Sequence, residues 1–217
     1  MNRTFYQRVG KRWLDAMLAF LGLVLVSPIL IIAAIAVRLT SPGPVFFKQL
    51  RTGQSGEPFR IFKFRTMVAS ASVCGPLVTS ESDERITTTG RWLRKTKVDE
   101  LPQLINVLRG EMSIVGPRPE VPRFTAAYSD RQKCVFFAKP GITGLAAITY
   151  IQEQELLGNR ADSEDFYLTS ILPAKLELDL AYCENIRFLE DLKLVFLTIS
   201  RILAARKPLP RAAENQT

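Results

Sequence analysis

The sequence contains no histidine among its 217 residues. This absence excludes a histidine general base, a Ser-His-Asp triad and a histidine-ligated zinc site. Cysteine is also scarce, since only Cys74, Cys134 and Cys183 are present and they lie far apart. Three widely spaced cysteines argue against a disulfide framework or a thiolate zinc site, and they favour reduced thiols on the cytosolic side.

Basic residues outnumber acidic ones. The sequence has 29 lysines and arginines and 21 aspartates and glutamates, which gives a formal net charge of +8. Such a balance suits nucleic acid, an anionic membrane surface or a phosphorylated substrate. The sequence shows no nucleic-acid-binding motif, P-loop, dinucleotide fingerprint or internal repeat. The basic residues gather at an apolar segment and at a pair of carboxylates, so we expect no nucleic-acid partner.

A long uncharged run covers residues 16–37. With a rise of about 1.5 Å per residue, a helix over this run could cross a bilayer core of about 30 Å. Ser27 and Pro28 lie near its middle, and a proline removes a hydrogen bond and bends a helix. Basic residues flank both ends, whereas a spanning helix usually carries lysine and arginine on one side. From the residues alone, a re-entrant helix and a spanning helix both remain open.

Residues 96–120 carry the densest set of signals. Asp99 and Glu100 form an adjacent pair of carboxylates. An apolar stripe with helical spacing follows at Leu101, Leu104, Ile105 and Leu108. Gly110 then stands where a C-terminal cap would lie. This pattern places Asp99 at a helix N-terminus, where free N–H groups and the helix dipole favour anions.

Two interpretations of Asp99 remain open. An aspartate at a helix start is more often a cap, and Thr96-x-x-Asp99 fits a capping box. The alternative is a catalytic carboxylate, since cations surround the pair and suit a phosphorylated, metal-bound substrate. These cations are Arg85, Arg91, Arg94, Lys95, Lys97, Arg109 and Arg118, the last held in a Gly-Pro-Arg-Pro turn.

The remaining pattern predicts an α+β fold that is mainly helical, with amphipathic helices at the membrane surface. Two strand-like runs, Val45–Arg51 and Pro58–Phe64, predict a β-hairpin, and residues 69–84 predict a loop. Residues 85–95 are expected to form a basic helix or turn. Further helical segments are expected at Arg123–Phe137, near 163–185 with a break at Pro173, and at 188–204. The last helix has an apolar side and a basic end, which suits either a membrane surface or a packed core with a basic tail.

Four stretches together make the chain resemble the bacterial sugar transferases, or monotopic phosphoglycosyl transferases. They are Lys11-Arg12-x-x-Asp15 with Ser27-Pro28, the block 43–67, the block Leu93–Pro119, and Pro140–Gly144 with Leu176–Tyr182. The third block is long and highly specific. The resemblance covers about residues 11–203 and implies that the chain corresponds to the minimal catalytic unit of the family.

The resemblance implies a double displacement on a UDP-sugar that binds with Mg²⁺. The carboxylate of Asp99 would attack the β-phosphate, expel UMP and form a covalent phosphosugar intermediate. Polyprenyl (undecaprenyl) phosphate would then attack this intermediate and give a polyprenyl-diphosphate sugar, which starts glycoconjugate assembly. A carboxylate nucleophile splits a hard displacement into two easier steps. Glu100 is expected to bind Mg²⁺, which uses few protein carboxylates together with substrate phosphates.

Further substrate-binding residues follow from the matched motifs. Arg94 and Arg118 match the family pattern and are expected to grip phosphate, as arginine can do bidentately. Lys63 and Arg65 are additional candidates. Asp179 resembles a family acid near the site.

The segment after Ala138 bears on nucleotide and sugar recognition. A tight turn is predicted at Lys139–Gly144, and its backbone and the Thr143 hydroxyl could hold a nucleotide, although such turns are mostly structural. Many relatives carry a glutamine at the position of Ala147, whereas here a long acidic insert follows to Asp165. We expect this region to influence the choice of donor sugar.

The resemblance also favours a re-entrant helix, which would keep the enzyme in one leaflet, with its catalytic domain on the cytoplasmic face of a bacterial inner membrane. We therefore expect an N-terminal interfacial segment with the membrane helix (1–40), a cytosolic transferase domain (41–205) and a basic, polar tail (206–217). Two alternatives stay open. One is a non-catalytic, membrane-associated basic protein that binds anionic lipid, and the other is an enzyme of the same reaction class that uses direct transfer, with Asp99 only a metal ligand.

Overall fold

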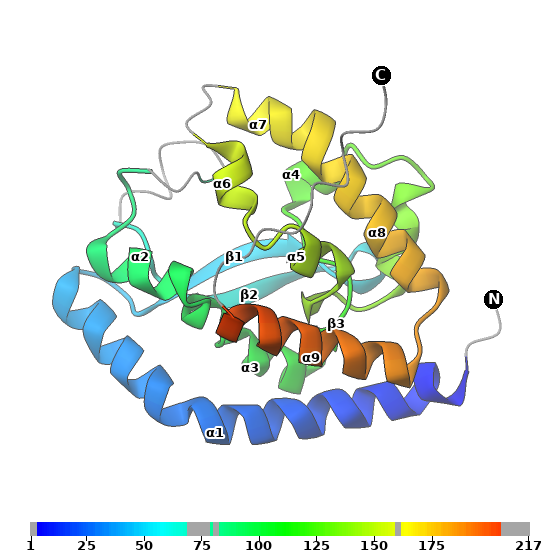
Figure 1. Ribbon diagram of the computed structural model, residues 1–217, viewed down its shortest axis with the longest axis horizontal. Coiled ribbons are helices and arrows are strands. Elements are labelled where there is room, and N and C mark those ends of the chain that lie inside the picture. Colours follow the sequence, from blue (N-terminus) through cyan, green and yellow to red (C-terminus); the bar gives the residue numbers. More distant parts are fainter. Residues whose placement is uncertain (1–3, 69–78, 80–82, 159–161, 205–217) are drawn as a thin grey trace.

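The computed structural model describes residues 4–68, 79, 83–158 and 162–204, and it shows a mainly helical α+β fold with two small sheets (Figure 1). This confirms the predicted α+β, mainly helical class, whereas the re-entrant course of the N-terminal helix and the helices at a membrane surface stay predictions. The predicted loop 69–84 lies mostly, and the tail 206–217 entirely, outside the described residues. The helices are α1 (Lys11–Thr40), α2 (Thr88–Lys95), α3 (Gln103–Arg109), α4 (Pro122–Thr125), α5 (Leu145–Thr149), α6 (Glu153–Leu157), α7 (Ser163–Phe166), α8 (Leu172–Glu184) and α9 (Phe188–Ala204). The strands are β1 (Phe46–Thr52), β2 (Pro58–Phe64), β3 (Ser113–Val115) and β4 (Gly141–Thr143).

Helix α1 carries the long apolar run and follows a π-helical turn, Tyr6–Gly10. Together they form a 35-residue segment, Tyr6–Thr40, which is long and apolar enough to cross a membrane by length and composition. Only 11% of its apolar window is buried inside the protein. Most of this apolar surface therefore needs a non-aqueous environment.

Pro28 lies inside α1 without interrupting it. The expected break is instead a bend, which Figure 1 shows about midway along the helix. A proline cannot donate the hydrogen bond that its helical position would make to the carbonyl four residues earlier, which here belongs to Val24. The Ser27 hydroxyl donates to that carbonyl at 2.8 Å. The Ser-Pro pair therefore bends the helix while satisfying the carbonyl that the proline leaves free.

Polar side chains near the start of α1 fasten it to the rest of the protein. Arg12 donates to the carbonyls of Val107 and Leu108 at 2.6 and 2.8 Å, and it thereby satisfies the C-terminal end of α3. Asp15 is buried and accepts the backbone N–H of Ile114 at 3.0 Å. The first half of α1 is thus held against the helix that follows the carboxylate pair.

The predicted hairpin is present as the antiparallel pair β1–β2, which begins with Phe46 opposite Phe64. Phe59 and Ile61 pack into a core with residues of α1 and α3. Phe64 packs instead with Leu93 of α2 and with the second half of α1. The hairpin therefore rests on both halves of the apolar helix.

The single helix expected at Arg123–Phe137 is wrong. Helix α4 ends at Thr125, and a separate 3-10 turn covers Gln132–Phe137. The interruption has a local cause, because Ser129 and Gln132 cap one another. The Ser129 N–H donates to the Gln132 side chain at 2.9 Å, and the Gln132 N–H donates to the Ser129 hydroxyl at 3.3 Å. This reciprocal cap starts a new turn instead of extending α4.

The helical segment expected near 163–185 is continuous. Helix α7 leads through a π-helical turn, Tyr167–Ile171, into α8. Pro173 occupies the first turn of α8, where a missing N–H is tolerated. The predicted break is therefore a π-turn just before the proline.

The second sheet pairs β3 and β4 in parallel, with Ser113 opposite Gly141. The last predicted helix is confirmed as α9, and its Leu194 packs with Val115 of β3. The opposite side of α9 leaves apolar side chains exposed, among them Phe196. Because β3 leads directly into the Gly-Pro-Arg-Pro turn, this sheet positions the arginine of that turn.

Candidate functional site

Asp99 and Glu100 lie in a short 3-10 turn, Val98–Glu100, between α2 and α3. The preceding Lys97 has a φ of 59°, a left-handed conformation that is uncommon outside glycine and that turns the chain after α2. Helix α3 begins only at Gln103. Asp99 therefore lies in a separate turn four residues before α3, and the prediction that it stands at the N-terminus of that helix is wrong.

Asp99 is not the second half of a capping box either. The Thr96 hydroxyl donates to the Trp92 carbonyl at 3.0 Å, within its own helix end. Asp99 Oδ1 is buried and finds no hydrogen-bond partner among the described residues. The positive charges of Lys63 and Arg94 act on this side chain and favour its ionised form.

Asp99 is buried, with 8% of its surface exposed, and this burial has the largest effect on its pKa. Burial, and then the negative charge of Glu100, raise the pKa of Asp99 from 3.8 to about 6, while the charges of Lys63 and Arg94 oppose the rise. The carboxylate is therefore still mainly ionised at neutral pH. A desolvated carboxylate with an unpaired oxygen can act as a nucleophile or as a metal ligand.

Glu100 has the opposite environment. Its Oε1 accepts hydrogen bonds from Lys63 Nζ at 2.7 Å and from Arg118 Nη2 at 3.2 Å. Burial alone would raise the pKa of Glu100, but the charges of Lys63 and Arg118 outweigh it and hold that pKa well below its usual value. Two adjacent carboxylates thus differ in role, since one is neutralised by two cations and the other is left unbonded.

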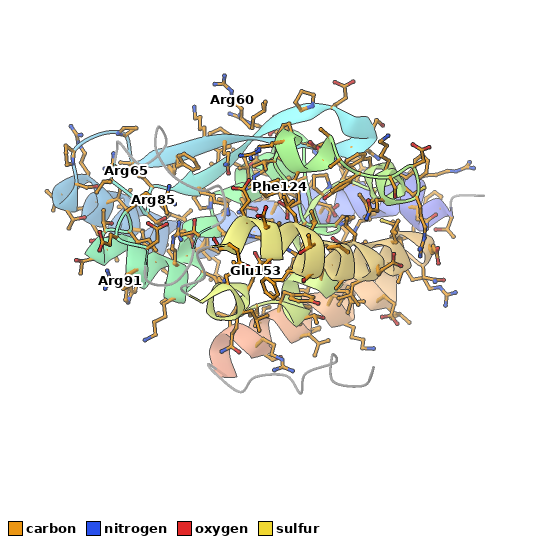
Figure 2. All side chains as sticks on the ribbon, turned by 90° about the horizontal axis from the view of Figure 1, so that it is seen from above. Arg60, Arg65, Arg85, Arg91, Phe124 and Glu153 are labelled. Atoms are coloured by element: carbon orange, nitrogen blue, oxygen red, sulfur yellow. The ribbon has the colours of Figure 1, made fainter. Side chains whose placement is uncertain are left out.

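Arg94 and Arg65 reach the site from α2 and from the end of β2. Arg94 Nε donates to the Thr66 hydroxyl at 2.9 Å, and burial lowers the pKa of Arg94 while Asp99 opposes this. Arg65 Nη2 donates to the carbonyl and the hydroxyl of Ser41, both at 2.7 Å, and Arg65 lies at the same end of the molecule as α2 (Figure 2). Arg94 Nη1 and Arg65 Nε and Nη1 are buried and meet no acceptor within the described ranges. An anionic ligand would satisfy such N–H groups.

The turn that holds Arg118 is fixed through its backbone. The Arg118 N–H donates to Asp179 Oδ2 at 3.2 Å, and Arg51 donates to the Pro119 carbonyl at 3.0 Å. Burial raises the pKa of Asp179 from 3.8 to about 7. The guanidinium of Arg118 is left to face Glu100, and its pKa is raised by that carboxylate.

A buried charge network behind Arg118 escaped sequence reasoning. Glu120 accepts the Tyr167 hydroxyl at 2.6 Å and lies 3.6 Å from Lys175 Nζ. Lys175 is 2% exposed and donates to Glu153 at 2.7 Å. This network joins α8 and α6 to the segment that follows the arginine turn.

One sequence signal could have revealed this network. In α8, an apolar stripe with helical spacing is interrupted on its own face by two charged residues, Lys175 and Asp179. The stripe consists of Leu172, Leu176 and Leu180, all buried. A charge at a core position of an amphipathic helix is rarely tolerated without a partner, so such positions mark buried ion pairs.

The predicted substrate-binding residues divide into two groups. Lys63 and Arg118 contact Glu100, and the charge of Arg94 acts on Asp99. Asp179 is joined to this group through the backbone of Arg118, whereas Arg65 bonds to Ser41. Thr143 lies in β4 instead, and its hydroxyl shares a 2.6 Å hydrogen bond with Thr198 of α9. Within the described chain, no hydrogen bond or ion pair joins Thr143 to the carboxylates.

The carboxylate oxygens of the site also decide which divalent metal it could bind. In the part of the chain that the structure describes, no three Cys, Asp or Glu side chains gather as a metal site. Mg²⁺ nevertheless fits the Asp99–Glu100 pair, because this ion commonly takes one or two carboxylates and completes its shell with water and substrate phosphates. The unpartnered Asp99 Oδ1 provides a free oxygen ligand. The pair therefore suits Mg²⁺ together with a phosphorylated ligand, not a closed protein cage.

Comparison with known proteins shows which family has a sequence similar to this chain. The chain matches the bacterial sugar transferase family over residues 6–205. An uncharacterized sugar transferase of Bacillus subtilis, EpsL, is 40% identical over 195 residues, which cover 90% of this chain and 88% of that protein. A UDP-glucose:undecaprenyl-phosphate glucose-1-phosphate transferase of Caulobacter vibrioides is 38% identical over 89% of this chain and 69% of its own length.

A protein with the same name in Escherichia coli is 40% identical over 88% of this chain, but over only 40% of its own length. The chain thus spans most of the Bacillus relative and less than half of the Escherichia one. The match to the family extends over nearly all described residues, including the carboxylate pair and the arginine turn. The chain therefore belongs to the bacterial sugar transferase family.

Proposed function

We propose that this chain transfers a sugar-1-phosphate from a UDP-sugar to undecaprenyl phosphate and releases UMP. Relatives in Caulobacter vibrioides and Escherichia coli are named for this reaction with UDP-glucose, and one in Aeromonas hydrophila is named for it with UDP-N-acetylgalactosamine. Since the sugar differs between these relatives, the proposal extends to the UDP-sugar class and to undecaprenyl phosphate as acceptor.

The observation that carries the proposal is the contrast within the carboxylate pair. Glu100 is neutralised by Lys63 and Arg118, whereas Asp99 Oδ1 is buried and unpartnered among the described residues. A carboxylate that was only structural would be paired, because an unpaired buried charge is costly. The unpaired oxygen beside several cations fits a nucleophile that waits for a phosphorylated substrate.

The proposed reaction has two displacements at one phosphorus atom. In the first, an Asp99 oxygen attacks the β-phosphorus of the UDP-sugar, the bond from that phosphorus to the bridging oxygen breaks, and UMP leaves with the electron pair. In the second, a phosphate oxygen of undecaprenyl phosphate attacks the aspartyl phosphosugar. The bond between Asp99 and phosphorus then breaks, which restores the carboxylate and yields undecaprenyl-diphosphate sugar.

Neither displacement requires a proton to be removed from the attacking group. The Asp99 carboxylate and the acceptor phosphate are both ionised near neutral pH, so no general base is needed. This is consistent with a chain that has no histidine. Lys63, Arg94 and Arg118 would stabilise the charge on the transferring phosphoryl group and on the departing UMP.

Glu100 would hold Mg²⁺ alongside the donor diphosphate. When bound, the ion would neutralise charge on the leaving nucleotide. Lys63 and Arg118 would keep Glu100 ionised and oriented for this task, since both contact its Oε1.

The proposal includes a one-leaflet membrane position on the cytoplasmic face of a bacterial inner membrane. The bend of α1 at Ser27-Pro28 supports a helix that enters and leaves on the same side, and the small buried share of its apolar window supports contact with lipid. The acceptor has a polyprenyl tail, so its phosphate needs to reach Asp99 only from the membrane surface. This arrangement needs no passage of substrate across the bilayer.

The first test is UMP release by the protein in lipid nanodiscs, with Mg²⁺, undecaprenyl phosphate and a panel of UDP-sugars. We expect release with at least one sugar, and loss of release in Asp99→Asn, which keeps the shape of the side chain. An exposed acid such as Asp130→Asn serves as the matched control and should retain activity.

The same assay separates the alternatives. With donor alone, the wild type should release about one equivalent of UMP and retain a phosphosugar adduct detectable by mass spectrometry. Turnover that survives in Asp99→Asn, or turnover without an adduct, would favour direct transfer with Asp99 as a metal ligand. Lipid binding without UMP release from any donor would favour a non-catalytic, membrane-associated protein.

A further inference from the structure

We propose that Asn106 is a positioning residue that sets the contact between Lys63 and Glu100. Asn106 lies in α3 and is 0% exposed. The inference rests on the proposed function, because Lys63 and Glu100 belong to the site proposed for the donor diphosphate. It assigns a role to a side chain that does not itself reach the reacting atoms.

The Asn106 amide is fully engaged with the neighbouring strand. Its Oδ1 accepts the backbone N–H of Phe62 at 3.0 Å. Its Nδ2 donates to the Arg60 carbonyl at 2.8 Å and to Glu111 Oε2 at 2.7 Å. Both hydrogens of Nδ2 and the oxygen of the amide therefore have partners in a place that water does not reach.

These contacts imitate a strand at the free edge of β2. In a parallel ladder, one residue bonds to the carbonyl of residue i and to the N–H of residue i+2 of its neighbour. Asn106 does this with Arg60 and Phe62, and it thereby closes an edge that β1 does not cover. Because Asn106 contacts β2 at two points, it fixes where α3 lies along β2 as well as the distance between the helix and the strand.

The catalytic contact joins the same two segments. Lys63 follows Phe62 directly, and Glu100 stands in the turn that leads into α3. Alternation along β2 puts Lys63 on the same face as Phe59 and Ile61, which pack against α3. With β2 and α3 locked by Asn106, Lys63 Nζ reaches Glu100 Oε1 at 2.7 Å.

Loss of the amide would therefore act through Lys63. A small slide of β2 along α3 would leave the apolar packing possible but would lengthen the Lys63–Glu100 contact. Withdrawal of Lys63 would leave Glu100 Oε1 with Arg118 as its remaining cationic partner among the described residues. A shift of about 1 Å in a charged group at a reacting centre can cost about a hundredfold in rate.

The test is a double-mutant cycle on donor-only UMP release, measured in a single turnover. We expect Asn106→Leu to slow release about tenfold to a hundredfold. In the Lys63→Met background, Asn106→Leu should change the rate less than about twofold, because the contact that it positions is already gone.

Thr125→Val is the matched control. Thr125 also ties the hairpin to a helix through a buried side-chain bond, 2.7 Å to Thr52, but at the other end of β1. It should lower stability, and its effect on release should multiply independently with that of Lys63→Met. If Asn106→Leu does not fold, Asn106→Ser, a neutral substitution whose shorter side chain loses the two-point contact with β2, carries the same comparison.

The outcomes are distinguishable from a failure of the proposed function. If the wild type releases no UMP from any donor, the proposed function fails. If the wild type is active and the Asn106 and Lys63 effects multiply independently, Asn106 is only structural and the inference is overturned.

Discussion

The carboxylate of Asp179 accepts a hydrogen bond from the backbone N–H of Arg118, at 3.2 Å, and thereby holds the arginine turn from α8. The bond goes to the backbone, so the Arg118 guanidinium stays free to contact Glu100. Asp179 therefore acts on the shape of the turn. An amide oxygen could make the same bond as a carboxylate oxygen.

This relationship predicts different outcomes for two substitutions of Asp179. Asp179→Asn should keep UMP release within about threefold, because its amide oxygen can still accept the Arg118 N–H. Asp179→Ala should cost about tenfold or more, since the N–H is left unpaired. Steady-state UMP release measures both. A dead Asp179→Asn with an intact fold would instead assign Asp179 a charge-dependent role such as metal binding.

The pKa of Asp99 predicts an acid limb in the first half-reaction. Only the ionised carboxylate can attack, and its pKa is raised to about 6, so single-turnover UMP release should fall about tenfold per pH unit below pH 6. Arg94→Gln should move the limb to higher pH, because the charge of Arg94 lowers this pKa. Arg91→Gln, an exposed arginine on the same helix, is the control and should leave the limb in place. A limb near pH 4 would contradict the burial argument.

Lys175 is predicted to be a stability residue. It is 2% exposed and lies between Glu153 and Glu120, so Lys175→Met would leave the buried Glu120 with less compensation. We expect a loss of about 3–5 kcal/mol in the free energy of unfolding, measured by denaturation in detergent micelles. Lys193→Met is the control, since the exposed Lys193 pairs weakly with Glu190 at 3.9 Å and should change stability by at most about 1 kcal/mol. Equal effects of the two substitutions would contradict the proposed burial cost.

Arg12 is predicted to couple the apolar helix to the site. Arg12→Gln would lose charged hydrogen bonds to the Val107 and Leu108 carbonyls at the end of α3. We expect a cost of about 1.5–3 kcal/mol in unfolding free energy and slower UMP release in nanodiscs. Arg8→Gln, an exposed arginine before α1, should have little effect on either. Unchanged stability in Arg12→Gln would show that apolar packing alone holds α1.

The proposed re-entrant topology predicts a labelling pattern. In a cysteine-free background, single cysteines at the exposed positions Arg8 and Arg60 flank the apolar segment. Both should react with a membrane-impermeant maleimide in inverted membrane vesicles, and neither should react in sealed vesicles of the opposite orientation. Reaction of the two positions from opposite sides would establish a spanning helix. Pro28→Leu should shift the population toward spanning, because it removes the bend.

Local sequence patterns by themselves predict several secondary-structure elements of this protein and its family. The apolar run of α1, the hairpin strands and the glycine that ends α3 with a φ of 81° all follow from periodicity and from single-residue backbone preferences. The long motif around Asp99 identified the family, because a motif is a linear property of the chain. In each case the cause and its effect lie within one element.

The interactions that give the site its chemistry were decided only in three dimensions. Lys63 and Glu100 lie 37 positions apart, and the burial that raises the pKa of Asp99 comes from neighbours that no sequence window contains. Tertiary packing also turned Thr143 toward Thr198 and buried Asn106 against the edge of β2. Periodicity reports which face of an element is apolar, whereas long-range pairing and desolvation depend on which elements meet, and only the folded chain brings them together.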